Sequence, residues 1–546
     1  MKKTTSVSGL RLLSVGVRLG LGLLAAATSM HASAAVPPEY AASYAVEEVS
    51  LQQVSMDLAS GKATSVDAVK SYILRIKQYD DPLNGVIGIA PDAFKQAEES
   101  DRRRKAGKLL GPLDGVPILL KDNLDAVGMP TTAGSFALEH NYPLEDSEVV
   151  QRLRAAGAVI LGKANTSQYA GFRTSKGLNG STLGGSSRNP YDLTRSAAGS
   201  SNGPGIAAAA SFAAGTIGTE TSGSITGPAN VNGVVGIKPT IALVSRRGIV
   251  PISLNQDTAG PIVRTVTDAA MMLTVIAGSD AGDPWSKDAD AHKADYVKAL
   301  SKDALKGKRI GVLRGLRGQD EKTNPVFSEA LSVLTAQGAK LVEIADTGWV
   351  DIRPEMRILL QHDFKEDLNA YLAGTAPGVK VRTLADLIEF NKNDAREALN
   401  SQDVLIESEA TTGGRQNPEY IKTLAAALKM TRDDGIDRLL KKNKVVALVT
   451  VTGSAADVIP PDNSGSSGAV SAQPRGSQPA SATAYAATAG YPHLSVPMGQ
   501  VSGMPIGLSF IGPMWSEDLL LSLGYSYEQA SKKRVPPEAY KHVIGR

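Results

Sequence analysis

The sequence predicts an α/β protein, and three observations lead to this class. Short apolar runs typical of buried strands alternate with amphipathic patterns typical of helices along most of the 546 residues. Hydrophobic residues make up 42% of the chain and charged residues 21%, which is the balance of a soluble globular protein. No internal repeat and no clear linker divides the sequence. We therefore expect one large domain.

The amino-terminal half begins with two predicted helices. Thr64-Ser65-Val66-Asp67 reads as a capping box that opens the first helix, and the second runs from Pro91 to Gly107, with the basic residues 102–105 at a solvated end. A buried strand at 116–120 then ends at Lys121. Further on we expect a helix at 148–156, a strand at 159–161, a Gly/Ser/Asn-rich loop system at 175–205, a small buried helix at 207–214, a strand that starts at 217 and breaks at 222–224, and strands at 233–237 and 249–252.

The alternation resumes in the carboxyl-terminal half. We expect strands at 309–313, 341–344, 445–451, 494–499 and 505–511, helices at 325–337 and 517–530, and mostly helical structure over 354–441. Residues 453–485 are rich in Gly, Ser, Pro and Ala and carry little charge. A loop of this length inside a compact domain is typical of a lid or binding loop, which is our prediction for this segment.

Residues 1–35 have the pattern of a secretory signal peptide. Lys2, Lys3, Arg11 and Arg18 supply positive charge, an apolar run starts at Leu19, and Ala32-Ser33-Ala34 has the form of a cleavage site. The alternative is a membrane anchor, but the uncharged run 19–35 is short for a span. We expect cleavage near Ala34 or Ala35, which leaves a mature domain of residues 36–546 in the periplasm or the medium.

The charge of the chain excludes some partners. The whole chain has 58 basic and 55 acidic residues, but four basic residues lie in the expected signal, so the mature chain has 54 against 55 and a net charge of −1. This balance gives no reason to expect a nucleic acid or an anionic membrane as a partner. No second hydrophobic segment suggests stable membrane association, and the oligomeric state is left open.

Several kinds of site are disfavoured by residues that are missing. The chain has no cysteine, which excludes disulfides, thiolate metal sites and a cysteine nucleophile. None of its six histidines is paired at a metal-binding spacing. The glycine-rich stretch 199–205 lacks the Gly-Lys-Ser/Thr of a phosphate loop. We therefore expect neither a metal nor a cofactor.

One alternative site is a G-x-S-x-G match at Gly199, Ser201 and Gly203, with His493 as a base. This motif is the nucleophile elbow of α/β-hydrolases, and it requires a strand directly before it. The preceding residues 192–196 are polar, which disfavours this interpretation.

A second constellation combines one lysine with two serine loops. Lys121 ends an apolar strand, where burial would lower its pKa and let the amine act as a base near neutral pH. A serine needs such a base within hydrogen-bonding reach to become a nucleophile. Glycines beside Ser200 and Ser224 would let backbone N–H groups converge, so Thr221-Ser222-Gly223-Ser224 could form an oxyanion hole. Each feature alone is more often a surface lysine or a plain turn.

The three segments together resemble the amidase signature family. They are 115–123 around Lys121, 198–203 around Ser200 and 218–225 around Ser224, in this order and with the family's separation between the two serines. The likeness continues through 232–240 and 256–261 and returns at 489–497 and 507–512. The resemblance implies an α/β fold with a central mixed, twisted sheet covered by helices on both faces.

The resemblance also implies a mechanism. Ser224 would be the acylating nucleophile, Ser200 would follow a cis peptide bond and relay a proton, and neutral Lys121 would be the base. Thr221, Ser222 and Gly223 would bind the oxyanion or the substrate. Asp122 and Asn123 would orient the lysine region.

The sequence departs from the family pattern at three places. Ser222 replaces a common glycine, Thr226 stands where arginine is frequent, and residues 201–204 lack the common double glycine. None of these removes a catalytic group, although Thr226 argues against substrates that need a cationic anchor.

Within the family, the motifs at 218–221 and 248–253 look most like bacterial peptide amidases, which release the terminal carboxamide of peptides as ammonia. The expected partner is therefore a peptide or small-molecule amide. Small aliphatic, aryl or fatty amides remain alternatives, as does, more remotely, a non-catalytic exported binding protein. The signal pattern argues against a role in the glutamyl-tRNA amidotransferase complex.

Overall fold

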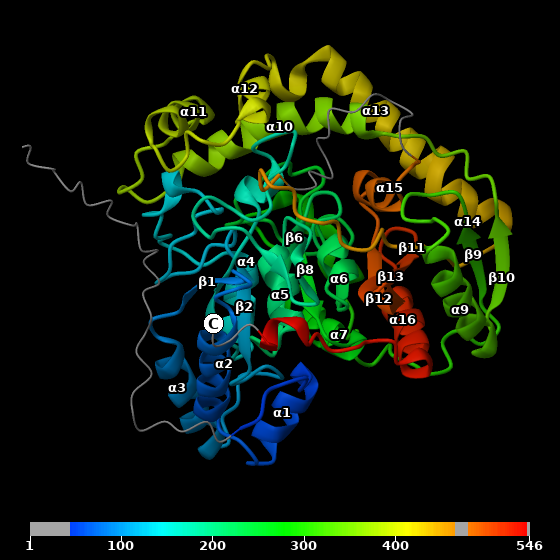
Figure 1. Ribbon diagram of the computed structural model, residues 1–546, viewed down its shortest axis with the longest axis horizontal. Coiled ribbons are helices and arrows are strands. Elements are labelled where there is room, and N and C mark those ends of the chain that lie inside the picture. Colours follow the sequence, from blue (N-terminus) through cyan, green and yellow to red (C-terminus); the bar gives the residue numbers. More distant parts are fainter. Residues whose placement is uncertain (1–43, 465–478, 543–546) are drawn as a thin grey trace, which may run out of the picture. The chain divides into compact units, whose positions relative to one another are not determined.

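The main feature of the computed structural model, which describes residues 44–464 and 479–542, is an eleven-stranded mixed sheet (Figure 1). Its strand order is β1-β3-β2-β6-β8-β7-β12-β13-β11-β9-β10, and β4 with β5 forms a separate two-stranded sheet. The strands are β1 (Val86–Ile89), β2 (Pro117–Lys121), β3 (Val159–Ala164), β4 (Arg188–Asn189), β5 (Asp192–Ser196), β6 (Gly215–Glu220), β7 (Val235–Lys238), β8 (Thr258–Val263), β9 (Arg309–Leu313), β10 (Lys340–Ile344), β11 (Ala447–Val451), β12 (His493–Val501) and β13 (Met504–Ile511).

Helices cover both faces of this sheet. Every residue of β2, β6, β8 and β13 is buried, and because alternate residues of a strand point to opposite faces, both faces must be covered. The α/β class and the layered sheet are thus confirmed. The helices outside the segment between β10 and β11 are α1 (Leu51–Ala59), α2 (Ser65–Tyr79), α3 (Ala93–Lys105), α4 (Glu148–Ala155), α5 (Asn202–Ala209), α6 (Thr226–Val231), α7 (Val266–Ile276), α8 (Ala289–His292), α9 (Thr323–Ala336), α15 (Ala482–Ala489) and α16 (Glu517–Ser531).

Strands β3, β2 and β6 are parallel neighbours, and this arrangement positions the site. Leu120 of β2 pairs with Ile217 of β6, so the carboxyl ends of the two strands lie side by side. Lys121 is the last residue of β2, and Glu220 is the last of β6. Open α/β sheets bind ligands at the carboxyl ends of their strands, which is where Lys121 lies.

The segment between β10 and β11 is mostly helical, as the sequence predicts. It contains α10 (Arg353–Ala373), α11 (Leu384–Asn393), α12 (Asp403–Glu409), α13 (Pro418–Thr431) and α14 (Asp437–Asn443). Helix α10 packs against α12 and α13, and α13 packs against α15, whose amino-terminal end follows the undescribed residues 465–478.

Glu397, between α11 and α12, is a fully buried carboxylate that joins this helical segment to the loops before β4. It accepts hydrogen bonds from Ser135 Oγ at 3.0 Å, from the Phe136 N–H at 2.8 Å and from Thr182 Oγ1 at 2.9 Å. Arg173, which is also buried, forms an ion pair with it. One charged group is therefore shared by segments far apart in the sequence.

Several predicted elements differ from the structure, among them the small helix expected at 207–214, which is α5 and ends at Ala209. Residues 175–205 are not a loop throughout, because β4 and β5 pair within them and α5 begins at Asn202. The strand expected at 249–252 does not form. Only Ile249 makes a bridge, to Leu124, and the N–H of Ile252 donates to the Asp257 carboxylate instead of to a neighbouring strand.

The predicted loop at 453–485 ends earlier than expected, because Ala482 opens helix α15 with Ser481 as its cap. Its central part, 465–478, lies outside the described residues, and a lid or binding role for this segment stays a prediction. The expected signal, 1–35, also lies outside the described residues.

Candidate active site

Lys121 projects from the carboxyl end of β2 into a fully buried position. Its Nζ lies 2.7 Å from Ser200 Oγ and 2.8 Å from Thr219 Oγ1, and it also lies 3.2 Å from the Thr219 carbonyl oxygen. Thr219 belongs to β6, the neighbour of β2, whereas Ser200 comes from the loop between β5 and α5. The structure thus brings together two of the three residues that the sequence predicts for catalysis.

Burial controls the charge of Lys121. Removal from water disfavours the ammonium form and lowers the pKa of Lys121 to about 7, although the negative charges of Asp257 and Glu220 oppose this effect. In a large fraction of the molecules Lys121 is then a neutral amine near neutral pH. Such an amine can accept a proton from the Ser200 hydroxyl, which is already within hydrogen-bonding distance.

Ser200 is held through its main chain. The Gly199–Ser200 peptide bond is cis. The Ser200 carbonyl accepts hydrogen bonds from the Ser167 N–H at 3.0 Å and from Thr166 Oγ1 at 3.2 Å. Gly199 packs closely on Ser167, because a Cβ at this position would lie 2.4 Å from Ser167 Oγ and the hydroxyl would have to rotate away. These contacts fix the backbone and leave the Ser200 hydroxyl directed at Lys121.

Ser224 lies in the turn between β6 and α6, and Glu220 pins the far end of that turn. Glu220 Oε2 accepts hydrogen bonds from the N–H groups of Ile225 at 2.8 Å and Thr226 at 3.0 Å. Gly223 has φ of 80°, a conformation that favours glycine. Ser224 is 8% exposed. Its hydroxyl is hydrogen bonded neither to Ser200 nor to any other of the described residues.

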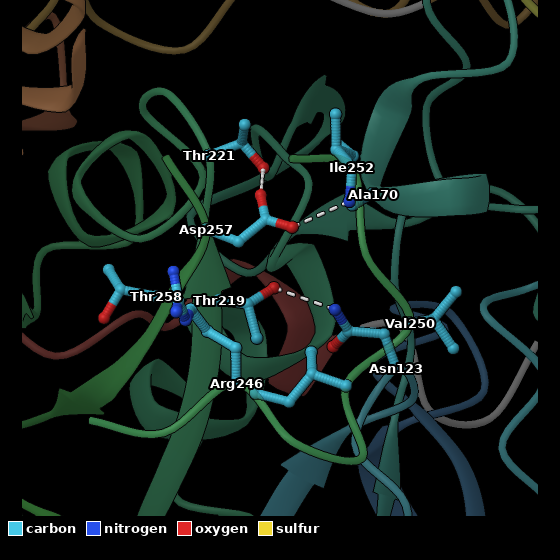
Figure 2. Close-up of a pocket in the computed structure, with 10 residues that line it drawn as sticks. Asn123, Ala170, Thr219, Thr221, Arg246, Val250, Ile252, Asp257 and Thr258 are labelled. Carbon is cyan, nitrogen blue, oxygen red and sulfur yellow. Dashed lines mark hydrogen bonds between the residues drawn. The ribbon is translucent and has the colours of Figure 1, made fainter. Parts of the chain in front are cut away.

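The near end of the same turn is tied to residues before β8. Thr221 Oγ1 donates to Asp257 Oδ1 at 2.5 Å, and Gln256 Nε2 donates to the Thr221 carbonyl at 3.2 Å. Figure 2 shows Thr221, Asp257 and Thr219 around a small pocket that Asn123 also lines. Both ends of the turn are therefore anchored by buried carboxylates.

Between these anchors the backbone donors are free. Among the described residues, the N–H groups of Ser222, Gly223 and Ser224 donate to no protein acceptor, whereas those of Ile225 and Thr226 donate to Glu220. Ser222 and Gly223 are also partly exposed. Consecutive free donors in a fixed turn are what an oxyanion hole requires. The Thr221 side chain points away toward Asp257.

Comparison with known proteins shows the family of this chain. The Amidase family profile matches residues 67–521. The chain belongs to the amidase signature family. A probable amidase of Arabidopsis thaliana is 35% identical, and the alignment covers 94% of this chain and 96% of that one. A glutamyl-tRNA(Gln) amidotransferase component from Thermosynechococcus vestitus is 32% identical over 88% of this chain and 98% of its own.

Solved structures give the same result. The native peptide amidase of Stenotrophomonas maltophilia is 41% identical to this amidase, with a TM-score of 0.83, over 90% of this chain and 98% of that one. An amidase family protein of Bacillus anthracis is 32% identical with a TM-score of 0.78, over 90% of this chain and 93% of its own. The protein is therefore a hydrolase that acts on amide bonds.

The two residues after Lys121 have different surroundings in this amidase. Asn123 Nδ2 donates to Thr219 Oγ1 at 3.0 Å, so it orients a direct partner of Lys121, as expected. Asp122 does not contact Lys121. It pairs with Lys163 at 3.4 Å and accepts a hydrogen bond from Thr132, because its side chain points to the opposite face of β2. Asp122 is therefore part of a separate buried ion pair.

The alternative site with Ser201 and His493 does not form. Ser201 Oγ donates to the Thr219 carbonyl at 3.0 Å and accepts from the Thr219 N–H at 3.2 Å. His493 Nε2 lies 2.6 Å from Ser509 Oγ inside the sheet, and burial lowers the pKa of His493 to about 3. Each group is committed to other partners.

Three residues of the site were not singled out from the sequence. Thr219 and Glu220 lie inside the recognised motif, but nothing in their spacing indicated that they contact Lys121 or the turn. Asp257 lies in the matching segment 256–261, and only the fold brings it next to Thr221. In the described part of the chain, no group of three His, Asp or Glu side chains could hold a metal ion. No helix there has the length and apolar character to cross a bilayer.

Proposed function

We propose that this amidase hydrolyses carboxamides through an acyl-serine intermediate, with Ser224 as nucleophile, Ser200 as proton relay and Lys121 as base. The observation that carries the proposal is the 2.7 Å contact between Ser200 Oγ and the buried Nζ of Lys121. A lysine with a pKa of about 7 is a competent base at neutral pH, and its Nζ is already within hydrogen-bonding distance of the Ser200 hydroxyl.

The proposed reaction has two halves. Lys121 accepts the Ser200 proton as Ser200 accepts the Ser224 proton, and Ser224 Oγ attacks the carbonyl carbon. The oxyanion that forms is held by the free N–H groups of residues 222–224. The protons then return along the same path to the amide nitrogen, which leaves as ammonia. Water, activated by the same relay, hydrolyses the ester to carboxylate and Ser224.

The relay requires the Ser224 hydroxyl to meet Ser200. In the structure the two hydroxyls are not hydrogen bonded. Catalytic hydrogen bonds are commonly open in unliganded enzymes and close in the substrate complex. Because the backbone of the turn is pinned at both ends, we expect rotation about the Ser224 side-chain torsion to close the relay.

For the substrate we propose the carboxyl-terminal amide of peptides. Support comes from the motifs at 218–221 and 248–253 and from the 41% identity with the Stenotrophomonas maltophilia peptide amidase over 90% of this chain. Thr226, in place of the frequent arginine, is consistent with a substrate that brings no anionic group to this position. Small aliphatic, aryl and fatty amides are the alternatives that the experiment distinguishes.

The test compares four substrates: an N-acylated dipeptide amide, a free amino-acid amide, an aliphatic amide and an acylated aniline. Ammonia release is measured for the first three and aniline release for the acylated aniline. We expect the highest kcat/KM with the dipeptide amide. The variant Ser224→Ala should be inactive and unlabelled by a sulfonyl fluoride, whereas Ser222→Ala, which lies in the same turn, should still be labelled at Ser224. Labelling of Ser224→Ala at full stoichiometry would refute the assignment of the nucleophile.

We also propose that the enzyme is exported, because residues 1–35 have the charge, apolar run and cleavage pattern of a signal peptide. Amino-terminal sequencing of protein from the periplasm or the medium should begin at Ala35 or Val36. Recovery of the chain from the cytosol with Met1 intact would contradict export and leave the catalytic proposal untouched.

A further inference from the structure

Asp257 is a buried carboxylate whose two oxygens hold two different segments. Oδ1 accepts the hydrogen bond from the Thr221 hydroxyl at 2.5 Å. Oδ2 accepts hydrogen bonds from the N–H groups of Ile252 at 2.7 Å and Ser253 at 2.9 Å. Figure 2 shows the carboxylate between Thr221 and Ile252. The turn that carries Ser224 is thus fastened to residues 252–257 by one side chain.

Residues 252–257 are in turn held by helix α10. Ser253 Oγ donates to Asp363 Oδ2 at 2.6 Å, and the Leu254 N–H donates to Asp367 Oδ2 at 2.9 Å. Arg415 forms ion pairs with both of these carboxylates. A continuous set of hydrogen bonds therefore leads from α10 through Asp257 to Thr221 in the turn.

Asp257 also acts on Lys121 through its charge. Asp257 and Glu220 are the two acidic groups that favour the ammonium form of Lys121, against the effect of burial. The charged group that acts on Asp257 from α10 is Asp367, and burial raises the pKa of Asp257 to about 6, so it is ionised at neutral pH. Arg246 lines the same pocket, but its guanidinium is paired with Asp283.

We propose that Asp257 is a positioning residue of the reaction, which holds the turn through Thr221 and stabilises the ammonium of Lys121 that forms when the relay accepts a proton. The inference rests on the proposed function, because it assumes Lys121 as the base. Forming an ammonium ion in a fully buried site is costly unless a negative charge is near. Asp257, together with Glu220, supplies that charge, and the same Asp257 carboxylate aligns the oxyanion donors through Thr221.

The first test separates the hydrogen bond from other effects of position 221. Thr221→Val keeps the shape and removes the hydroxyl, whereas Thr221→Ser keeps the hydroxyl. We expect Thr221→Val to lower kcat about tenfold or more with little change in KM, since the donors it displaces act in the transition state. Thr221→Ser should restore at least half of the kcat. Equal kcat values for wild type and Thr221→Val would overturn the proposed alignment.

The second test concerns the charge and uses the pH dependence of kcat/KM. Asp257→Asn removes a negative charge near Lys121, so the pKa of Lys121 falls and the acid limb should move to lower pH by about one unit. Asp363→Asn is the matched control, because Asp363 contacts Ser253 but neither Thr221 nor Lys121. Its acid limb should stay at the wild-type pH. An unmoved limb in Asp257→Asn would overturn the charge effect.

A further variant, Lys121→Arg, distinguishes this inference from the proposed function. If Lys121→Arg retains activity, the base is misassigned and the proposed function fails. If Lys121→Arg is inactive while Asp257→Asn and Thr221→Val behave as wild type, only the role of Asp257 fails. Should Asp257→Asn fail to fold, which melting by circular dichroism would reveal, the Thr221→Val and Thr221→Ser pair still decides the alignment.

Discussion

Replacing Lys121 with arginine should abolish activity although it preserves a positive charge. Burial lowers the pKa of Lys121 to about 7, so at pH 8 about nine-tenths of the side chains are neutral. An ordinary lysine with a pKa of about 10.4 would be neutral in about 0.4% of molecules, and an arginine in less than about 0.01%. Since only the neutral form can accept the Ser200 proton, we expect kcat to fall at least about 10³-fold.

The assay is ammonia release from a peptide amide between pH 5.5 and 9.5. For the wild type, kcat/KM should rise with pH and reach half its maximum near pH 7, because the pKa of Lys121 is lowered and the deprotonated form is active. Lys121→Ala should lose as much activity as Lys121→Arg. The control is His493→Gln, since His493 is hydrogen bonded to Ser509 inside the sheet and should be dispensable for catalysis. An inactive, folded His493→Gln beside an active Lys121→Ala would refute the reasoning.

Three further predictions follow from the same geometry. Ser200→Ala should break the proton path. Because the effects of residues that act together are not additive, the double variant Ser200→Ala with Lys121→Ala should lose little more kcat than the worse single variant. A multiplicative loss would mean that the two residues act independently. Glu220→Ala leaves the N–H groups of Ile225 and Thr226 without their acceptor. This change should cost about 1–3 kcal/mol of stability in a melting experiment and should lower kcat. Glu220→Gln keeps an acceptor oxygen and should lose less stability and less kcat. Prolonged dialysis against a strong chelator should leave kcat unchanged, and loss that zinc or manganese restores would contradict a lysine-based mechanism.

Much of the fold could be predicted because its strands are apolar runs between clear turns. The strand at 309–313 has the predicted bounds, and the capping box at Thr64 and Asp67 opens α2 as expected. Strand β8 was not predicted, since Gly260 and Pro261 are residues that strands usually avoid. It forms because β6 and β7 supply partners on either side. Tertiary pairing therefore overrode the local preference.

The site was predictable in its residues more than in its contacts. The pairing of Lys121 with Ser200 could be inferred from a buried amine and a serine loop, together with the family resemblance. The role of Asp257 could not, because it depends on residues 252–257 turning back toward Thr221 instead of extending as a strand. Likewise, Asp122 follows Lys121 in the sequence, but the alternation of side chains along β2 sends it toward Lys163.

Glu397 has a consequence for engineering the enzyme by recombination. Exchanging the helical segment between β10 and β11 with that of a relative looks like a way to change specificity without disturbing Lys121 and Ser200. The crossover would, however, separate Glu397 from Ser135, Thr182 and Arg173, and it would leave a buried guanidinium without its carboxylate. Breaking a buried ion pair by removing one partner costs about 3–5 kcal/mol. Workable chimeras must therefore transfer these three residues with the helices. The residues that have to be exchanged together are those in contact with Glu397, and they are not contiguous in the sequence.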